Sequence, residues 1–188
     1  LMQAPSGSIS DLLMQGSVRL SGNTRVVPTA NNNRLFGTSG TLGAGDSLTI
    51  DSASTFTVDG GVLNFGIGLL DYVTNNGLLE ADGATVTLSP GAMTNNGTLR
   101  SSNGGNLRIA SVVVNNQSAT IEAQQASNVQ LVAGGGIHGG SVTLSNDSAL
   151  VVGPSDGGRL RGTIAMDGTI LMQAPSGSIS DLLMQGSV

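Results

Sequence analysis

Repetition on two length scales is the feature that most constrains how this chain can fold. Residues 1–18, LMQAPSGSISDLLMQGSV, recur without a change as residues 171–188, so a long period runs from Leu1 to Leu171. A match of this length does not arise by chance. We therefore expect 1–170 to be one tandem repeat unit and 171–188 to be the start of the next, identical one, with both copies in the same conformation.

A shorter period lies within the long one. VTNNGLLEA begins at Val73, MTNNGTLRS at Met93 and VVNNQSATIEA at Val113. We expect these three apolar residues to form one inward-facing column. Two positions are inserted in the third copy, and allowing for them produces a second inward column of Leu79, Leu99 and Ile121. A further strand in each copy ends at Leu88, Ile109 and Leu131.

The short period predicts an all-β fold, a parallel β-helix (β-solenoid) with rungs of about 20–22 residues. Runs of three to five alternating residues are bounded by Gly, Asn, Asp or Ser, which is typical of strands and turns, and no helical stripe extends beyond one turn. One rung cannot bury its apolar side chains alone, whereas rungs stacked about 4.8 Å apart bury them in continuous columns. Residues 54–72 depart from the rhythm, so the rung boundaries there stay open.

Paired asparagines recur at the turns and predict a structural ladder. Asn tolerates left-handed backbone angles, and its side-chain amide can bond the amide of the next rung. The expected columns are Asn75, Asn95 and Asn115, with Asn76, Asn96 and Asn116 beside them. The alternative is glycosylation, because Asn96, Asn116 and Asn146 each begin an Asn-X-Ser/Thr sequence. Only Asn146 lies outside the predicted ladder.

Three charged residues follow the second apolar column. Glu80, Arg100 and Glu122 alternate in sign from one copy to the next. A glycosidase would need two free carboxylates, and the two glutamates would lie about 10 Å apart, near the upper limit for inverting enzymes. Arg100 falls between them, so we interpret the set as a solvent-facing charge ladder.

No other pattern in the chain predicts catalysis, a metal or a cofactor. The aspartates are mostly single and adjoin turn glycines, and calcium-binding nonapeptides are absent. His138, the only histidine, lies in the glycine-rich stretch 134–140, where we expect a surface loop. With one Tyr and three Phe, a platform for sugar rings is hard to assemble. We predict that the protein is not an enzyme.

Composition excludes several classes of partner. All seven basic residues are Arg and are scattered, and a pI near 4.4 leaves no positive footprint for nucleic acid. No apolar run approaches the roughly 20 residues that span a bilayer, and no signal peptide is visible. Cysteine is absent, which excludes disulfides and thiolate metal sites.

The amino-acid sequence of the repeats resembles that of known surface proteins. NNGTLRSSNGGNLRI, NNQSATIEAQQASNVQL and GGSVTLSNDSALVV resemble the passenger repeats of giant bacterial surface proteins, namely filamentous-haemagglutinin-like exoproteins and autotransporters. The resemblance implies a right-handed β-helix at the cell surface or outside the cell. We expect a structural repeat of a rod, filament, sheath or stalk whose partner is itself, each terminal rung packing on a neighbouring repeat. The alternatives are an adhesin and, third, a carbohydrate-active β-helix enzyme.

Overall fold

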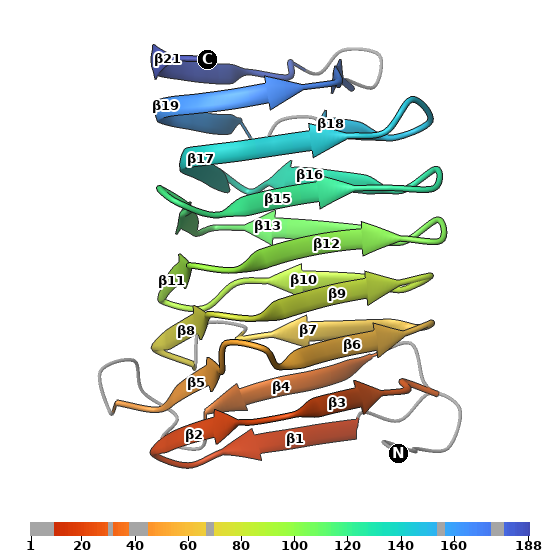
Figure 1. The fold of residues 1–188 in the computed structure, drawn as a ribbon, viewed down its shortest axis with the longest axis vertical. Helices are drawn as coiled ribbons and strands as arrows, with labels where there is room; N and C mark the ends of the chain where they lie inside the picture. Colours follow the sequence, from red (N-terminus) through yellow and green to blue (C-terminus); the bar gives the residue numbers. More distant parts are fainter. Residues whose placement is uncertain (1–9, 30–31, 38–44, 67–69, 154–156, 174–178) are drawn as a thin grey trace.

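The computed structural model describes residues 10–29, 32–37, 45–66, 70–153, 157–173 and 179–188. In this part of the chain all regular structure is β, and parallel strands coil into a solenoid of about seven turns. The chain rises from the N-terminal to the C-terminal end while near strands run one way and far strands return behind them, which is a right-handed coil (Figure 1). The predicted fold class is confirmed.

Strands stack in three columns, which form two sheets. Column 1 is an eight-stranded sheet. Its members are β1 (Ser10–Met14), β4 (Asn33–Gly37), β7 (Val62–Phe65), β10 (Thr85–Leu88), β13 (Asn106–Ala110), β16 (Asn128–Val132), β18 (Ala149–Val152) and β20 (Thr169–Met172).

Columns 2 and 3 lie side by side in the second sheet. Column 2 holds β2 (Ser17–Leu20), β5 (Ser47–Ile50), β8 (Tyr72–Asn75), β11 (Ala92–Asn95) and β14 (Val113–Asn115). Column 3 holds β3 (Asn23–Val26), β6 (Thr55–Asp59), β9 (Leu78–Asp82), β12 (Thr98–Ser102) and β15 (Thr120–Ala123). Two longer strands, β17 (Gly136–Leu144) and β19 (Gly158–Asp167), run through both columns, and β21 (Leu182–Ser187) pairs with the first part of β19.

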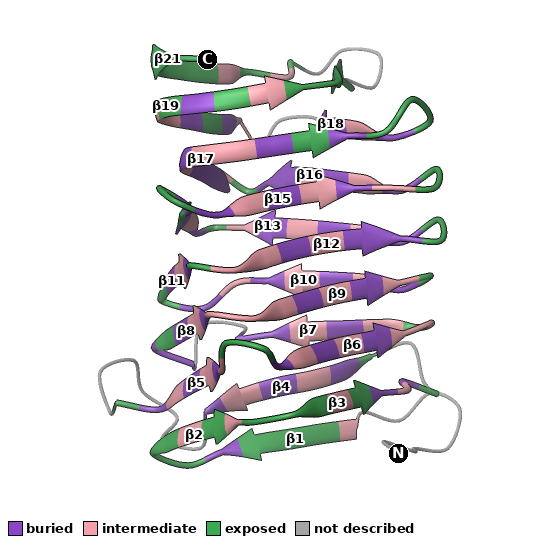
Figure 2. Ribbon diagram, in the orientation of Figure 1, coloured by how far each residue is buried: buried purple, intermediate pink, exposed green. Residues whose placement is uncertain are grey.

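Alternating side chains build a single apolar core along the axis. Strands such as β5, β10 and β11 alternate between partly exposed and buried residues, and the buried set stacks from rung to rung (Figure 2). Leu79, Leu99 and Ile121 are fully buried in one column, as predicted. Each contributes about 1.5–3 kcal/mol by leaving water. The interior is therefore a set of apolar columns that run along the axis.

Rung length is less uniform than the sequence rhythm predicts. Column 3 steps from Leu78 to Thr98 and then to Thr120, which agrees with the expected period. Near the N-terminus the steps are longer, because Ser17 pairs with Ser47 and Asn23 pairs with Thr55. The expectation of a constant short period therefore fails for the first rungs. In residues 54–72, where the sequence left the rung boundaries open, β6 lies in column 3 at the end of one rung and β7 lies in column 1 at the start of the next.

The two copies of the repeated segment do not share one conformation, which corrects the expectation. Leu12 pairs with Leu35 in column 1, whereas its counterpart Leu182 pairs with Gly158 in column 2. Both copies direct the same Leu and Met residues inward. The alternation of apolar and polar residues determines which side chains of a strand face the core, but it does not determine which column the strand joins. Because the rungs differ in length, the second copy of the segment lies one column further along than the first. Residues 1–9 and 174–178 of the copies lie outside the described residues.

Candidate functional site

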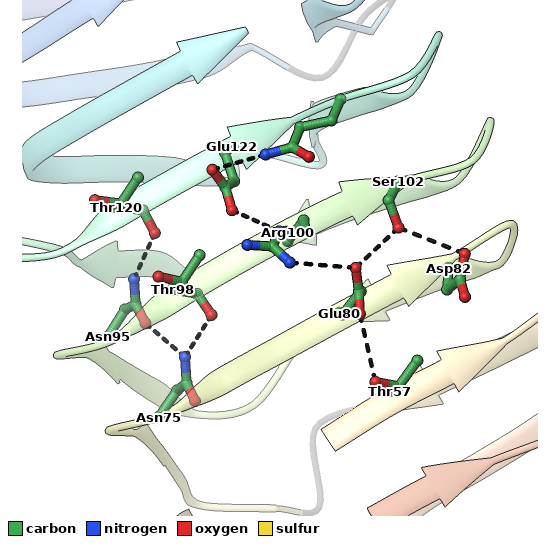
Figure 3. Close-up of polar contacts among 11 residues, drawn as sticks. Thr57, Asn75, Glu80, Asp82, Asn95, Thr98, Arg100, Ser102, Thr120 and Glu122 are labelled. Atoms are coloured by element: carbon green, nitrogen blue, oxygen red, sulfur yellow. Dashed lines mark hydrogen bonds and ion pairs between the residues drawn. The ribbon is translucent and has the colours of Figure 1, made fainter. Parts of the chain in front are cut away.

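A buried asparagine ladder occupies the corner between columns 2 and 3. Asn75 Nδ2 donates to Asn95 Oδ1 at 2.8 Å, and Asn95 Nδ2 donates to Asn116 Oδ1 at 2.7 Å. Figure 3 shows Asn75 and Asn95 with the hydrogen bond between them. Each of the first two amides also donates to a backbone carbonyl, of Thr98 and Thr120 respectively. The corner therefore satisfies buried polar groups where strand pairing is interrupted.

Asn115 was expected in this ladder, and its predicted place is wrong. Met93 pairs with Val114 and not with Val113, so Asn115 pairs with Thr94 and is exposed. The inward apolar residue is likewise Val114, which is fully buried, rather than Val113. One of the two inserted positions lies in the turn at 103–105, before the asparagines, and the other follows Asn116. The longer turn was a visible signal, but three consecutive valines fit either register.

The second asparagine column is shorter than predicted. Asn96 Nδ2 donates to Asn76 Oδ1 at 2.9 Å in an exposed pair, and Asn116, expected beside them, is in the buried ladder instead. Burial prevents modification of Asn116 in the folded chain. Asn96 and Asn146 are exposed, so the glycosylation alternative stays open at both.

The ladder has a direction and two different ends. Every amide donates toward the C-terminal end, where Asn116 Nδ2 reaches the carbonyls of Ala119 and Gly139 at 3.1 and 3.2 Å. At the N-terminal end Asn75 Oδ1 is buried without a hydrogen-bond partner, because the residue paired beneath it is Ile50. The side-chain oxygen of Asn75 therefore lacks the donor that an asparagine at the position of Ile50 would supply.

Buried acceptors at other corners were missed by sequence reasoning, which treated aspartates as turn residues. Asp46 Oδ1 accepts from the Gly16 amide at 2.6 Å, and Asp71 Oδ2 accepts from the Gly45 amide at 2.7 Å. Both carboxylates are buried. The Gly104 amide similarly donates to Ser127 Oγ at 3.1 Å. A side chain of one rung thus bonds the turn backbone of the rung before it.

The predicted charge ladder forms one column on β9, β12 and β15 (Figure 3). Arg100 lies 2.5 Å from Glu122 Oε1 through Nε and 3.6 Å from Glu80 Oε1 through Nη1. The three side chains are only 16–31 % exposed, so the column is half-buried rather than fully solvent-facing. Burial lowers the pKa of Arg100, but its bonds to Glu122 and then Glu80 outweigh this and raise it.

Similar pairs connect the first rungs. Arg34 holds Asp11 with two hydrogen bonds of 2.7 and 2.6 Å, and this contact lowers the pKa of Asp11 despite the opposing effect of burial. Arg19 contacts Asp51, and Arg25 contacts Asp59. In each pair the partners belong to neighbouring rungs, so the charges reinforce the stack.

His138 lies in strand β17 and not in the expected surface loop. It pairs with Asn115 on one side and Arg161 on the other. Because glycines have no side chain, residues 134–140 show no alternation of apolar and polar residues, so the sequence predicted a loop where the structure has a strand. Among the described residues no group of three or more His, Cys, Asp or Glu is arranged to hold a metal ion, and no helix is long and apolar enough to cross a membrane.

Comparisons with protein-family models, with characterised proteins and with solved structures find no match. The geometry itself is therefore the basis for a function. The polar side chains of the ladder and the charge column are bonded to adjacent rungs of the same chain, which gives them a role in stacking.

Proposed function

We propose that this chain is a structural unit of a long rod, filament, sheath or stalk at the cell surface or outside the cell. The observation that carries the proposal is the continuous parallel stacking of β1 to β20 in column 1. A stack of this kind adds length at about 4.8 Å per rung while its cross-section stays constant. The resemblance of the repeats to bacterial surface proteins supports the location.

The distribution of exposed apolar side chains supports a spacer rather than an adhesin. Of the large apolar residues exposed in the described part of the chain, all but Tyr72 lie in or beside the terminal strands β1, β20 and β21. A binding face would place such residues together on a side of the rod. Glu80 and Glu122 are held by Arg100, which argues against the hydrolase alternative.

Linked copies test the proposal. Proteins with one, two and four copies of residues 1–170 are compared by electron microscopy and small-angle scattering. A rod lengthens by roughly 34 Å per unit, about seven turns of about 4.8 Å, at constant width. Compact particles whose width grows with the number of units would contradict the proposal. Binding or cleavage on a glycan array would favour the adhesin or the enzyme.

A further inference from the structure

Three asparagines in the middle rungs are each followed by glycine, and their surroundings differ. They are Asn76, Asn96 and Asn103, which precede Gly77, Gly97 and Gly104. Asparagine is among the chemically labile residues of proteins. In an Asn-Gly sequence the glycine nitrogen can attack the asparagine side chain, because no side chain on the glycine obstructs the approach. The hydrogen bonds around each pair indicate which of the three is arranged for this reaction.

The attacking nitrogen is available at Gly77, in the corner between β8 and β9. The Asn76 amide before it donates to the Ile50 carbonyl at 2.9 Å. The Leu78 amide after it donates to the Ser54 carbonyl, also at 2.9 Å. Among the described residues the Gly77 amide itself has no acceptor. A Cβ at Gly77 would lie 2.2 Å from the Ser54 carbonyl oxygen, so the stacking of the rungs requires a glycine directly after this asparagine.

Asn103 is the opposite case. The Gly104 amide donates to the Gln125 carbonyl at 3.0 Å and to Ser127 Oγ at 3.1 Å. Attack by this nitrogen would break both hydrogen bonds, each of which contributes to the stacking of adjacent rungs. Asn103 is exposed, but its neighbouring nitrogen is held in place.

A hydrogen bond between rungs distinguishes Asn76 from Asn96. Asn96 Nδ2 donates to Asn76 Oδ1 at 2.9 Å. Attack on Cγ of Asn76 turns this oxygen into an oxyanion, and a donor that is already in place stabilises the developing charge. Within the part of the chain that the structure describes, Asn96 Oδ1 has no donor, because Asn116 on the next rung belongs to the buried ladder. The one hydrogen bond therefore activates Asn76 and not Asn96.

We propose that Asn76 is a site of spontaneous modification in the folded chain, at which the side-chain amide is converted to a carboxylate. The Gly77 nitrogen forms a bond to Asn76 Cγ, the bond from Cγ to Nδ2 breaks, and the proton from Gly77 leaves with Nδ2 as ammonia. Water then opens the cyclic imide: its hydroxyl adds to one ring carbonyl, and its proton returns to the Gly77 nitrogen. The product is an aspartyl or isoaspartyl residue. The inference goes beyond the proposed rod and does not depend on it.

The aspartyl product keeps the contact between the rungs. A carboxylate at position 76 accepts the same hydrogen bond from Asn96 Nδ2, which becomes charge-assisted and therefore stronger. Conversion of Asn96 would have the opposite result, because it removes the donor and places two oxygens against each other. The chain thus gains a negative charge at Asn76 without losing this hydrogen bond.

Incubation of the folded full-length chain in mildly alkaline buffer tests the proposal. Cleavage after Glu80 and after Arg100 places Asn76, Asn96 and Asn103 on three separate peptides, whose asparaginyl, aspartyl and isoaspartyl forms mass spectrometry and chromatography distinguish. We expect Asn76 to be converted about tenfold faster than the other two.

The chain unfolded in urea is the control for this rate difference, because all three Asn-Gly sequences should then react at similar rates. Equal rates in the folded chain, faster conversion of Asn96 or Asn103, or no conversion of Asn76 over the time in which the unfolded chain reacts would each overturn the inference.

Asn96→Asp tests the activating hydrogen bond, because it keeps the size of the side chain and removes the donor. Conversion of Asn76 should slow about tenfold in the folded variant and stay unchanged in the unfolded one. Asn115→Asp is the matched control: it adds the same charge at an exposed position of the next rung, and the rate at Asn76 should not change. Circular dichroism verifies that both variants are folded. A rate at Asn76 that is indifferent to Asn96→Asp contradicts the proposal.

Discussion

The solenoid turns from column 2 to column 3 in two different ways. In the rungs of Asn75, Asn95 and Asn116 the strand breaks, and a buried amide fills the corner. In the next rungs β17 and β19 continue through the corner, and glycines at positive φ make the bend: Gly139 (74°), Gly140 (79°) and Gly162 (75°).

The two kinds of corner meet where Gly140 lies over Asn116. A Cβ on Gly140 would lie 1.9 Å from the Asn116 backbone oxygen and 2.4 Å from its Nδ2. At the asparagine corner a side-chain amide donates to backbone carbonyls that strand pairing leaves without a donor. At the glycine corner the strand is continuous, so no side chain is needed for this purpose. The last amide of the ladder also requires a neighbour without a side chain. Which residue is tolerated at each corner therefore depends on the residue at the same position in the adjacent rung.

The largest effect should come from breaking this junction. Gly140→Ala combines a left-handed backbone angle with an atomic overlap that backbone atoms cannot easily relieve, so we expect a loss of about 3–5 kcal/mol in the free energy of unfolding by urea. Gly104→Ala is the matched control, with a φ of 76° and no atom within 4 Å of the added Cβ. Equal losses in the two variants would show that the junction is not the cause.

Removing the middle amide should have the next largest effect. Asn95→Ala leaves Asn75 Nδ2 and Asn116 Oδ1 without their side-chain partner, which should cost about 2–3 kcal/mol in the same urea measurement. Asn115→Ala, at an exposed position, should change stability by less than about 0.5 kcal/mol. The opposite order would restore Asn115 to the ladder and reject the observed register.

The asparagine ladder can be extended by one rung toward the N-terminal end. Ile50 lies beneath Asn75, whose Oδ1 lacks a donor, so Ile50→Asn can supply one. Leu48→Asn buries the same group on the same strand, two positions before the corner. Both variants lose stability, but Ile50→Asn should lose about 1–2 kcal/mol less, the value of satisfying one buried acceptor. Thermal and urea unfolding measure the difference, and equal losses would contradict the geometry at Asn75.

The smallest effect should come from the charge column. Arg100→Met keeps the apolar stem and removes both ion pairs, so we expect a loss of about 0.5–1 kcal/mol at low salt that shrinks as salt is added. Thr98→Ala on the same strand serves as a control for the salt response. A loss independent of ionic strength would indicate packing of the stem rather than charge.

The sequence pattern predicted the fold, and it also predicted the charge column of Glu80, Arg100 and Glu122. The charge column could be predicted because its residues directly follow apolar core residues. Glu80, Arg100 and Glu122 come immediately after Leu79, Leu99 and Ile121, so an error in turn length could not separate them. Asn115 and Asn116 come after a longer turn, and a shift of one position reverses which side chain is buried. Gly139 and Gly140 have no side chain to show alternation, so a continuous strand resembled a loop.

The spacing of paired strands also affects how the chain folds. In the middle rungs each residue finds its partner only one short period away, as Leu78 meets Thr98 and Val62 meets Thr85. Closing a loop costs more free energy as it lengthens, by about 0.6 kcal/mol per doubling, so these rungs form a nucleus from which pairing can propagate in both directions. Asn23 must find Thr55 across a longer stretch of chain. The strands of these first rungs should therefore pair after those of the middle rungs.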